Sequence, residues 1–130
     1  MKQYINSAVV WHSSLSKKNR LTLERVQKAA VKVILKNKYT NYKEGLKTLN
    51  IESLDERRRQ LCLKFAKNCL KIDKVKDMFK KKKNIHNMQK RRPKIFEEKN
   101  AKTKRYQISA IPYLSKLLNE DSEKKKHLLN

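Results

Sequence analysis

Hydrophobic and polar positions alternate with the period of an α-helix through the first half of the chain. A short helix over residues 2–13 is indicated by the helical spacing of its apolar residues. Ser16 is placed to cap a longer helix that runs to about Lys36. The apolar residues of this helix share one face, which we expect to point inward: Leu23, Val26, Ala30, Val33 and Ile34. A third helix, capped by Thr40, is expected to reach about Leu49.

The clearest local signal in the chain is Ser53-Leu-Asp-Glu56, which has the pattern of a capping box. In this motif the serine accepts a hydrogen bond from an unsatisfied helix amide, and the glutamate reaches back to the serine amide. We expect the helix that it begins to run from Leu54 to about Ile72. Its inward stripe consists of Leu54, Leu61, Cys62, Phe65, Ala66, Cys69 and Leu70.

The second half of the chain has a different composition. Residues 74–105 carry 14 Lys or Arg against 3 acids, so we expect basic loops there, and a short β-hairpin near 95–106 is compatible with the pattern. Ser109-Ala-Ile-Pro112 opens a last helix to about Leu118, and the tail after Asn119 is expected to fray. The sequence therefore predicts a mainly all-α fold: a small irregular domain of four to five helices with a basic loop region.

The composition favours the same fold and points to a polyanionic partner. One glycine and two prolines in 130 residues argue against a many-stranded sheet. The net charge of +23 destabilises the compact state through self-repulsion, which a nucleic acid would relieve. Two cysteines make no disulfide framework, and no signal peptide or membrane span is visible. We expect an intracellular protein, nuclear and/or cytoplasmic, that binds RNA and/or DNA largely without sequence specificity and has no membrane partner.

The candidate binding residues are the basic clusters and one aromatic residue beside them. Their members are Arg57, Arg58, Arg59, Lys80, Lys81, Lys82, Lys83, Lys90, Arg91, Arg92, Lys94, Lys104, Arg105 and Tyr106. Arg58 lies on the inward stripe, so it either extends its charged end to solvent, pairs with a carboxylate such as Glu24 or Glu44, or binds a phosphate at the rim of the core. Tyr106 could stack on a base or pack in a core, and the basic runs could simply be solvated.

Residues for catalysis or metal binding are not evident. Cys62 and Cys69 lie two helical turns apart, too far for a disulfide, and no further ligand stands near them, so we expect buried thiols. A single glycine excludes phosphate-binding glycine loops, and no paired carboxylates flank a strand. We therefore expect no enzyme activity, no cofactor and no metal site.

Several phrases in order resemble the region that follows the reverse-transcriptase domain in jockey-like non-LTR retrotransposon proteins. They lie at 8–15, 23–30, 39–42, 54–62, 86–88, 103–106, 112–113 and 117–119, and include Leu54-Asp-Glu-Arg-Arg58-Arg-Gln-Leu61-Cys62. The family's Tyr-x-Asp-Asp motif and endonuclease are absent from this sequence, and so is the Cys/His zinc knuckle of some related elements.

The resemblance implies a terminal fragment of an RNA-directed DNA polymerase. It would comprise a thumb-like helical region (1–72), a basic extension (73–107) and a terminal helix with a frayed tail (108–130). Such a fragment would grip template RNA or the primer–template duplex, with the upstream polymerase domain as a further partner. The alternative is a free-standing helical module that binds a protein and whose lysines only keep it in solution.

Overall fold

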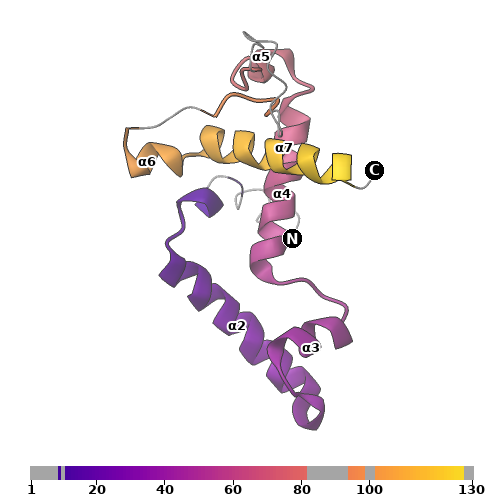
Figure 1. Cartoon of the computed structure of the whole chain (residues 1–130). Coiled ribbons are helices and arrows are strands. Elements are labelled where there is room, and N and C mark those ends of the chain that lie inside the picture. Colours follow the sequence, from indigo (N-terminus) through magenta and orange to yellow (C-terminus); the bar gives the residue numbers. More distant parts are fainter. Residues whose placement is uncertain (1–8, 10, 82–93, 99–101, 128–130) are drawn as a thin grey trace. The chain divides into compact units, whose positions relative to one another are not determined.

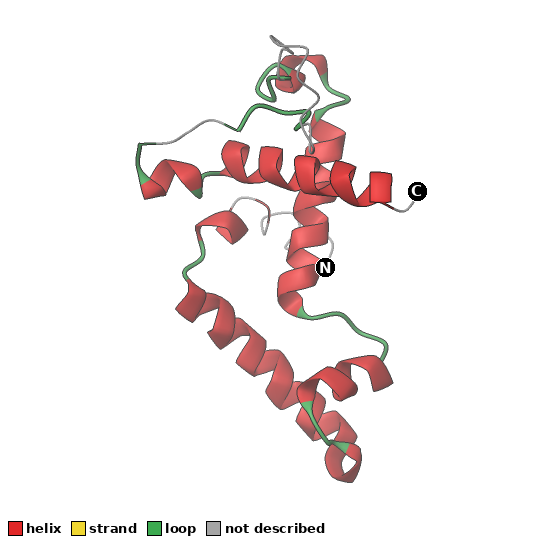
Figure 2. Ribbon diagram, viewed as in Figure 1, coloured by secondary structure: helices red, strands yellow, loops and turns green. Residues whose placement is uncertain are grey.

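α-Helices and connecting loops make up the described part of the chain, which comprises residues 9, 11–81, 94–98 and 102–127 of a computed structural model (Figure 1). The α-helices are α2 (Lys17–Leu35), α3 (Tyr42–Thr48), α4 (Leu54–Cys69), α5 (Asp73–Lys76), α6 (Lys104–Gln107) and α7 (Ala110–His127). Two short 3₁₀ helices are η1 (His12–Ser14) and η2 (Lys36–Lys38). Figure 2 shows no strand among these residues, so the expected all-α fold is confirmed. Most of the helix expected over 2–13 lies outside the described residues.

The chain forms two units. The core unit comprises residues 1–14 and 62–130, and the α2–α3 unit comprises residues 15–61. Helix α4 therefore contributes its first two turns to the α2–α3 unit and the rest to the core unit. None of the helices in the described ranges is long and apolar enough to span a membrane.

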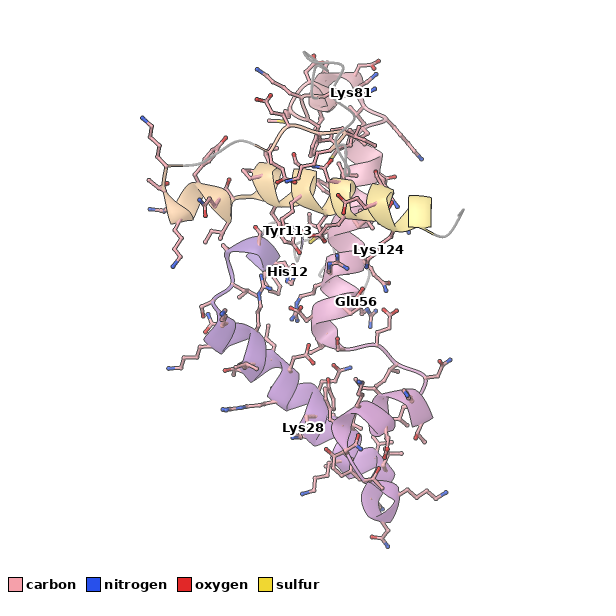
Figure 3. All side chains as sticks on the ribbon, viewed as in Figure 1. His12, Lys28, Glu56, Lys81, Tyr113 and Lys124 are labelled. Atoms are coloured by element: carbon pink, nitrogen blue, oxygen red, sulfur yellow. The ribbon has the colours of Figure 1, made fainter. Side chains whose placement is uncertain are left out.

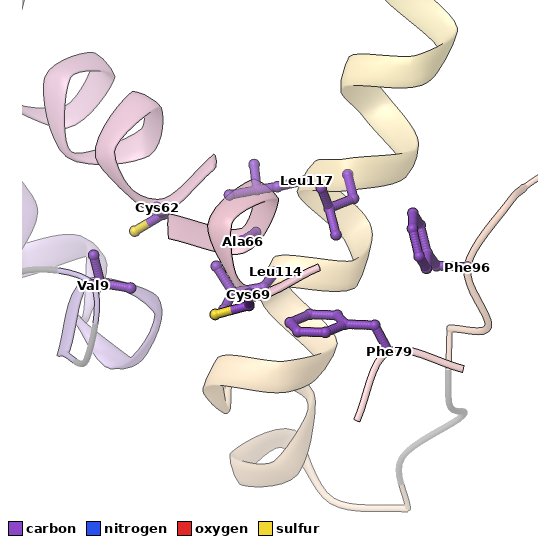
Figure 4. Packing of buried hydrophobic residues seen from close by; sticks show 9 residues of the cluster. Val9, Cys62, Ala66, Cys69, Phe79, Phe96, Leu114 and Leu117 are labelled. Carbon is purple, nitrogen blue, oxygen red and sulfur yellow. The ribbon is translucent and has the colours of Figure 1, made fainter. Parts of the chain in front are cut away.

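The core unit is organised by α4 and α7. Cys62, Ala66 and Cys69 are spaced i, i+4 and i+7, so they form one buried face of α4. That face belongs to one apolar cluster with residues of α7 and two loop phenylalanines (Figure 4). The buried members are Val9, Cys62, Ala66, Cys69, Phe79, Phe96, Leu114, Leu117 and Leu118. The expected burial of both cysteines is thus confirmed, and neither forms a disulfide.

Two expectations for α4 were wrong. Phe65, which was placed on the inward stripe, is exposed, because the buried face is centred on Cys62, Ala66 and Cys69. The helix also ends at Cys69 and not near Ile72. After Cys69 the backbone tightens into a turn, in which Ile72 N–H donates to the carbonyl of Cys69.

The last helix is longer than the sequence predicts. The tail after Asn119 was expected to fray, but α7 continues to His127. Two contacts extend the helix past Leu118: Lys67 Nζ lies 2.8 Å from Asp121 Oδ2, and the Ser122 hydroxyl donates to the carbonyl of Leu118. The exposed Lys124 follows Asp121 on this helix and places a positive charge toward the negative end of the helix dipole.

The α2–α3 unit is built on one close contact between its helices. Helix α2 begins as expected, with Ser16 Oγ accepting from Asn19 N–H at 3.2 Å. Val31 is its buried apolar side chain, and a Cβ added to Gly45 of α3 would lie 2.6 Å from Val31 Cγ1. The absence of a side chain at Gly45 therefore lets α3 approach α2 closely.

This contact reverses the expected orientation of α2. Most of the stripe placed inward by its spacing is exposed: Val26 is 66%, Val33 70% and Ile34 63% accessible, and Ala30 is exposed as well. Leu23 of the same stripe is half-buried. The buried side of α2 instead carries Val31 together with polar side chains. That side faces inward because Val31 fits over Gly45 and because Glu24 and Gln27 accept hydrogen bonds from the start of α4.

Two local expectations also change in detail. Asn41, and not Thr40, caps α3 by accepting from Glu44 N–H at 2.8 Å, while the Thr40 hydroxyl donates to the Glu44 carboxylate. The β-hairpin near 95–106 was wrong, because residues 104–107 form helix α6, capped by Thr103. Phe96 instead makes an isolated antiparallel bridge with Lys81.

Candidate nucleic-acid interface

The structure brings the described ends of the two basic runs together. Glu97 N–H donates to the carbonyl of Lys80 at 2.8 Å, and Lys81 pairs with Phe96 in the antiparallel bridge. The side chains of Lys80 and Lys81 are exposed beside this pairing, and Figure 3 shows Lys81 close to α5. Lys80 and Lys81, the described end of the run 80–83, therefore lie beside residues 96 and 97, which closely follow Lys94, the described end of the run 90–94. Lys82, Lys83, Lys90, Arg91 and Arg92 lie outside the described residues.

A buried asparagine on α7 anchors this pairing. Asn119 Oδ1 accepts from Phe96 N–H at 2.9 Å, and Asn119 Nδ2 donates to the Phe96 carbonyl and to Glu98 Oε1 at 3.1 Å each. One side chain thus satisfies both backbone groups of Phe96, whose ring is buried in the core cluster. Asn119 was not a candidate in the sequence, since the end of the last helix was placed before it.

Lys94 differs electrostatically from Lys80 and Lys81. Its Nζ lies 2.6 Å from Glu98 Oε2. Burial alone would raise the pKa of Glu98, but hydrogen bonds from Lys94 and Asn119 and the charges of Lys94 and Lys116 lower it overall. Glu98 is therefore a carboxylate at neutral pH that partly neutralises Lys94.

A pocket of about 1280 Å³ adjoins the same lysines. Its apolar lining comes from the core unit, and its charged lining combines lysines with carboxylates. The lining residues are Lys67, Leu70, Lys76, Asp77, Phe79, Lys80, Lys81, Ile95, Phe96, Glu97, Leu118, Asp121 and Ser122. Lys76 of α5 was not a candidate in the sequence, although it stands only four residues before the run at 80–83.

Helix α6 presents a second basic group in the core unit. Lys104 and Arg105 are exposed, and Tyr106 is 43% accessible. The Thr103 cap and the bond from the Ser109 hydroxyl to the Tyr106 carbonyl fix this turn. The ring of Tyr106 is therefore open to stacking, and the core-packing alternative does not describe its position.

The three arginines of α4 occupy three different environments. Arg58 is only 7% accessible and lies 3.6 Å from Asp55 Oδ1, so its position favours the ion-pair alternative over phosphate binding. The carboxylate partner is Asp55 and not Glu24 or Glu44. Arg59 lies 3.7 Å from Glu56 Oε1, and Arg57 is exposed. Of the three, Arg57 is the most accessible to a polyanion.

A polar network holds the start of α4, on which these arginines lie. Glu24 Oε1 accepts from Asp55 N–H at 2.6 Å, and Gln27 Oε1 accepts from Leu54 N–H at 2.9 Å. The Tyr42 hydroxyl lies 2.7 Å from Glu24 Oε2 and 2.9 Å from Gln27 Oε1. Burial, and then the hydrogen bond to Glu24 and its charge, raise the pKa of Tyr42.

The capping box that the sequence predicts is therefore only part of the cap. Ser53 Oγ accepts from Glu56 N–H at 3.3 Å, as expected, while α2 supplies acceptors for the two preceding amides. The signal for this contribution was present in the sequence as Glu24 and Gln27, three residues apart on one side of α2.

Two other groups that could take part in chemistry, Cys69 and His12, are buried. Burial raises the pKa of the Cys69 thiol, which makes its reactive thiolate less populated. His12 is buried, with its ring 5.8 Å from that of Tyr113 in an edge-on arrangement (Figure 3). Within the described ranges, no three His, Cys, Asp or Glu side chains are grouped so that they could hold a metal ion.

Comparison with known proteins gives no match: no family model, no curated protein and no solved structure corresponds to this chain.

Proposed function

We propose that this protein binds nucleic acid without catalysing a reaction, and holds the phosphate backbone through lysine and arginine side chains. The observation that carries this proposal is the anchored pairing of Lys80–Lys81 with residues 96–97. It gathers exposed cations on a fixed backbone in a chain of net charge +23. Such contacts confer affinity and little sequence specificity, because every nucleotide presents the same phosphate.

The parts of the site have distinct roles in this proposal. Asn119 and the buried ring of Phe96 fix the backbone, so that the lysines lose less conformational freedom on binding. Lys80 and Lys81 contact phosphates, with Lys76 beside them. On α6, Lys104 and Arg105 contact the strand, and Tyr106 stacks on an unpaired base.

The ordered phrases support an origin for this activity. We propose that the chain corresponds to the C-terminal region of a jockey-like non-LTR reverse transcriptase, acting on template RNA or primer–template with the polymerase domain as a partner, in the nucleus and/or cytoplasm. Remnants of a polymerase palm in the reading frame upstream of the gene would support this origin. A promoter or an intron with no such remnant would contradict it.

Fluorescence anisotropy of the purified chain with a short RNA and a DNA duplex tests the binding. If about 6–10 phosphates are contacted, affinity should fall about 10³–10⁵-fold between about 50 and about 200 mM salt. Lys80→Ala/Lys81→Ala should reduce the slope of log K against log salt by about 2 on duplex DNA, since each phosphate contact contributes about 0.9.

A charge-matched control separates a site from general attraction. Lys43→Ala/Lys47→Ala removes two exposed lysines of α3 and changes the net charge by the same amount. The control should leave the slope nearly unchanged. Equal effects of the two pairs would show that the charge acts diffusely, and absence of binding at low salt from a folded chain would refute the proposal.

A second candidate function is favoured by one observation, the exposed apolar face of α2. It supports the alternative of a helical module that binds a protein.

A further inference from the structure

Helix α2 carries an apolar stripe on its exposed side. We call the outer stripe the set Val26, Ala29, Ala30, Val33 and Ile34, all of which are exposed. These positions follow the i, i+3, i+4, i+7, i+8 spacing of one helix face. The opposite side of α2 packs through Val31 against Gly45. Helix α2 is therefore apolar on a side that the α2–α3 unit leaves uncovered.

A row of cations borders the outer stripe. Lys18, Arg25 and Lys32 are exposed and repeat every seven residues, which places them along one edge of the stripe. With Val26 and Val33 as the a positions of a heptad, these three residues occupy g positions. The single acid of α2, Glu24, is used elsewhere, because it accepts from Asp55 N–H and from the Tyr42 hydroxyl.

We propose that the outer stripe docks an amphipathic helix of another protein, whose apolar seam is flanked by Asp or Glu. Val26, Ala29 and Val33 would form a seam of small and β-branched side chains that allows a helix to approach closely. The carboxylates of the partner would face Lys18, Arg25 and Lys32, as charges at flanking heptad positions set the choice of partner. This inference deepens the interaction-module function and does not depend on nucleic-acid binding.

The same residues disfavour other occupants. In an antiparallel second copy the g positions face one another, so like charges would repel. In a parallel copy they would face the e positions Leu23 and Ala30, which offer no counter-charge. Helices that lie on lipid surfaces carry Trp, Phe or Leu on the apolar face, whereas the outer stripe has only Val, Ala and Ile. A phosphate backbone offers no apolar surface to bury. Charge complementarity therefore selects an acidic helical partner.

A synthetic peptide serves as the probe. The peptide has about 21 residues, or three heptads, with Leu at the a and d positions of each heptad and Glu at the e and g positions that flank them. Its binding to the full chain is followed by fluorescence anisotropy. Val26→Gln/Lys32→Glu should weaken binding about tenfold or more, since it removes one seam contact and reverses one flanking charge. Leu21→Gln/Lys28→Glu makes the same two kinds of change on exposed residues outside the stripe and should leave binding nearly unchanged.

Five outcomes would overturn the proposal. Both variants could weaken binding of the peptide equally, which would show that the outer stripe is not the site. A control peptide with Ser at the a and d positions and the same glutamates could bind as tightly, which would show that charge alone is responsible. Vesicles containing phosphatidylserine could show the same dependence on Val26 and Lys32, which would indicate a lipid surface. Sedimentation could show a dimer that the first variant dissociates. Finally, Val26→Gln/Lys32→Glu could lower the melting temperature of the free chain well below that of Leu21→Gln/Lys28→Glu, which would mean that the chain covers its own stripe.

Discussion

The core unit and the α2–α3 unit are stabilised by different interactions. In the core unit, Val9 and eight buried apolar side chains from α4, α7 and the loops around Phe79 and Phe96 form one cluster. In the α2–α3 unit, all of which is described, Val31 is the one buried apolar side chain. Its organisation depends instead on the hydrogen bonds of Glu24, Gln27 and Tyr42 with the start of α4.

The difference shows two ways of ordering a chain that is poor in apolar residues. Burial of apolar surface is non-directional and scales with area, so it suits the unit that collects most of the large side chains. Hydrogen bonds are directional and contribute little each, but an unmade buried one costs more than a made one gains. The α2–α3 unit should therefore be less stable and more sensitive to single polar substitutions.

The largest expected effect comes from opening the core unit. Leu117→Ala removes a buried side chain of α7 and should cost about 3 kcal/mol, within the range for large-to-small changes in cores. The single tryptophan, Trp11, belongs to the core unit, so its fluorescence during denaturant unfolding reports this loss. Leu21→Ala, at an exposed position of α2, should shift that transition very little. Equal shifts would mean that the cluster is not the source of stability.

A smaller effect is expected when the polar network is broken. Glu24→Ala removes the acceptor of Asp55 N–H and of the Tyr42 hydroxyl and should cost about 1–3 kcal/mol. Helix content followed by circular dichroism should then begin to fall before the Trp11 fluorescence changes. Glu52→Ala, which removes only the acceptor of an exposed Gln60 amide, is the matched control. Coincident transitions in Glu24→Ala would contradict separate stabilisation of the two units.

Gly45→Ala tests the close contact in the α2–α3 unit. The new methyl would meet Val31 Cγ1 at 2.6 Å and Leu35 Cδ1 at 3.2 Å, so packing should cost about 1–3 kcal/mol. Alanine regains about 1 kcal/mol of helix propensity, which leaves a net loss of about 1 kcal/mol. In a Val31→Ala background the same change should be neutral or stabilising. A loss that persists there would show that space at Val31 does not explain the glycine.

The sequence identifies the helices better than it identifies their buried faces. The caps at Ser16 and Ser53 and the buried cysteines follow from local patterns, because capping and helical spacing involve neighbouring residues. The orientation of α2 does not, since the helix has apolar residues on two sides and Gly45, 14 residues from Val31, decides which side is covered. The length of α7 was missed for a similar reason: Lys67, on another helix, pairs with Asp121.

The residues of the candidate site likewise fall into those that local sequence predicts and those that only long-range contacts reveal. Exposure of Lys80, Lys81 and Arg57 agrees with their basic surroundings in the sequence. Pairing of Arg58 with a carboxylate was one of the alternatives, but its partner is Asp55, three residues away on the same helix, and not Glu24 or Glu44. Asn119 could not be found from local pattern, because its partner Phe96 lies 23 residues earlier in the chain, before α6 and the start of α7.

The smallest expected effects are pH dependences of opposite direction in the two units. Glu98 of the core unit has a lowered pKa in the folded state, since the hydrogen bonds from Lys94 and Asn119 outweigh its burial. Its contribution to stability is therefore complete above its ordinary value of 4.5 and is lost as pH falls through the lowered pKa. Burial and Glu24 raise the pKa of Tyr42, so its contribution is complete below 10.0 and is lost as pH rises further.

Two conservative variants isolate these groups from the other titrations. In Glu98→Gln, the denaturant midpoint followed by Trp11 fluorescence should fall less at acid pH than it does in the unmodified chain. In Tyr42→Phe, the midpoint followed by helix content should fall less at alkaline pH. If Glu98→Gln instead changed the midpoint at alkaline pH, or Tyr42→Phe changed it at acid pH, the two groups would not act as their contacts indicate. Agreement would mean that acid weakens the anchored lysine pairing first, and alkali the network at the start of α4, because each pH limit acts on the hydrogen bonds of a different unit.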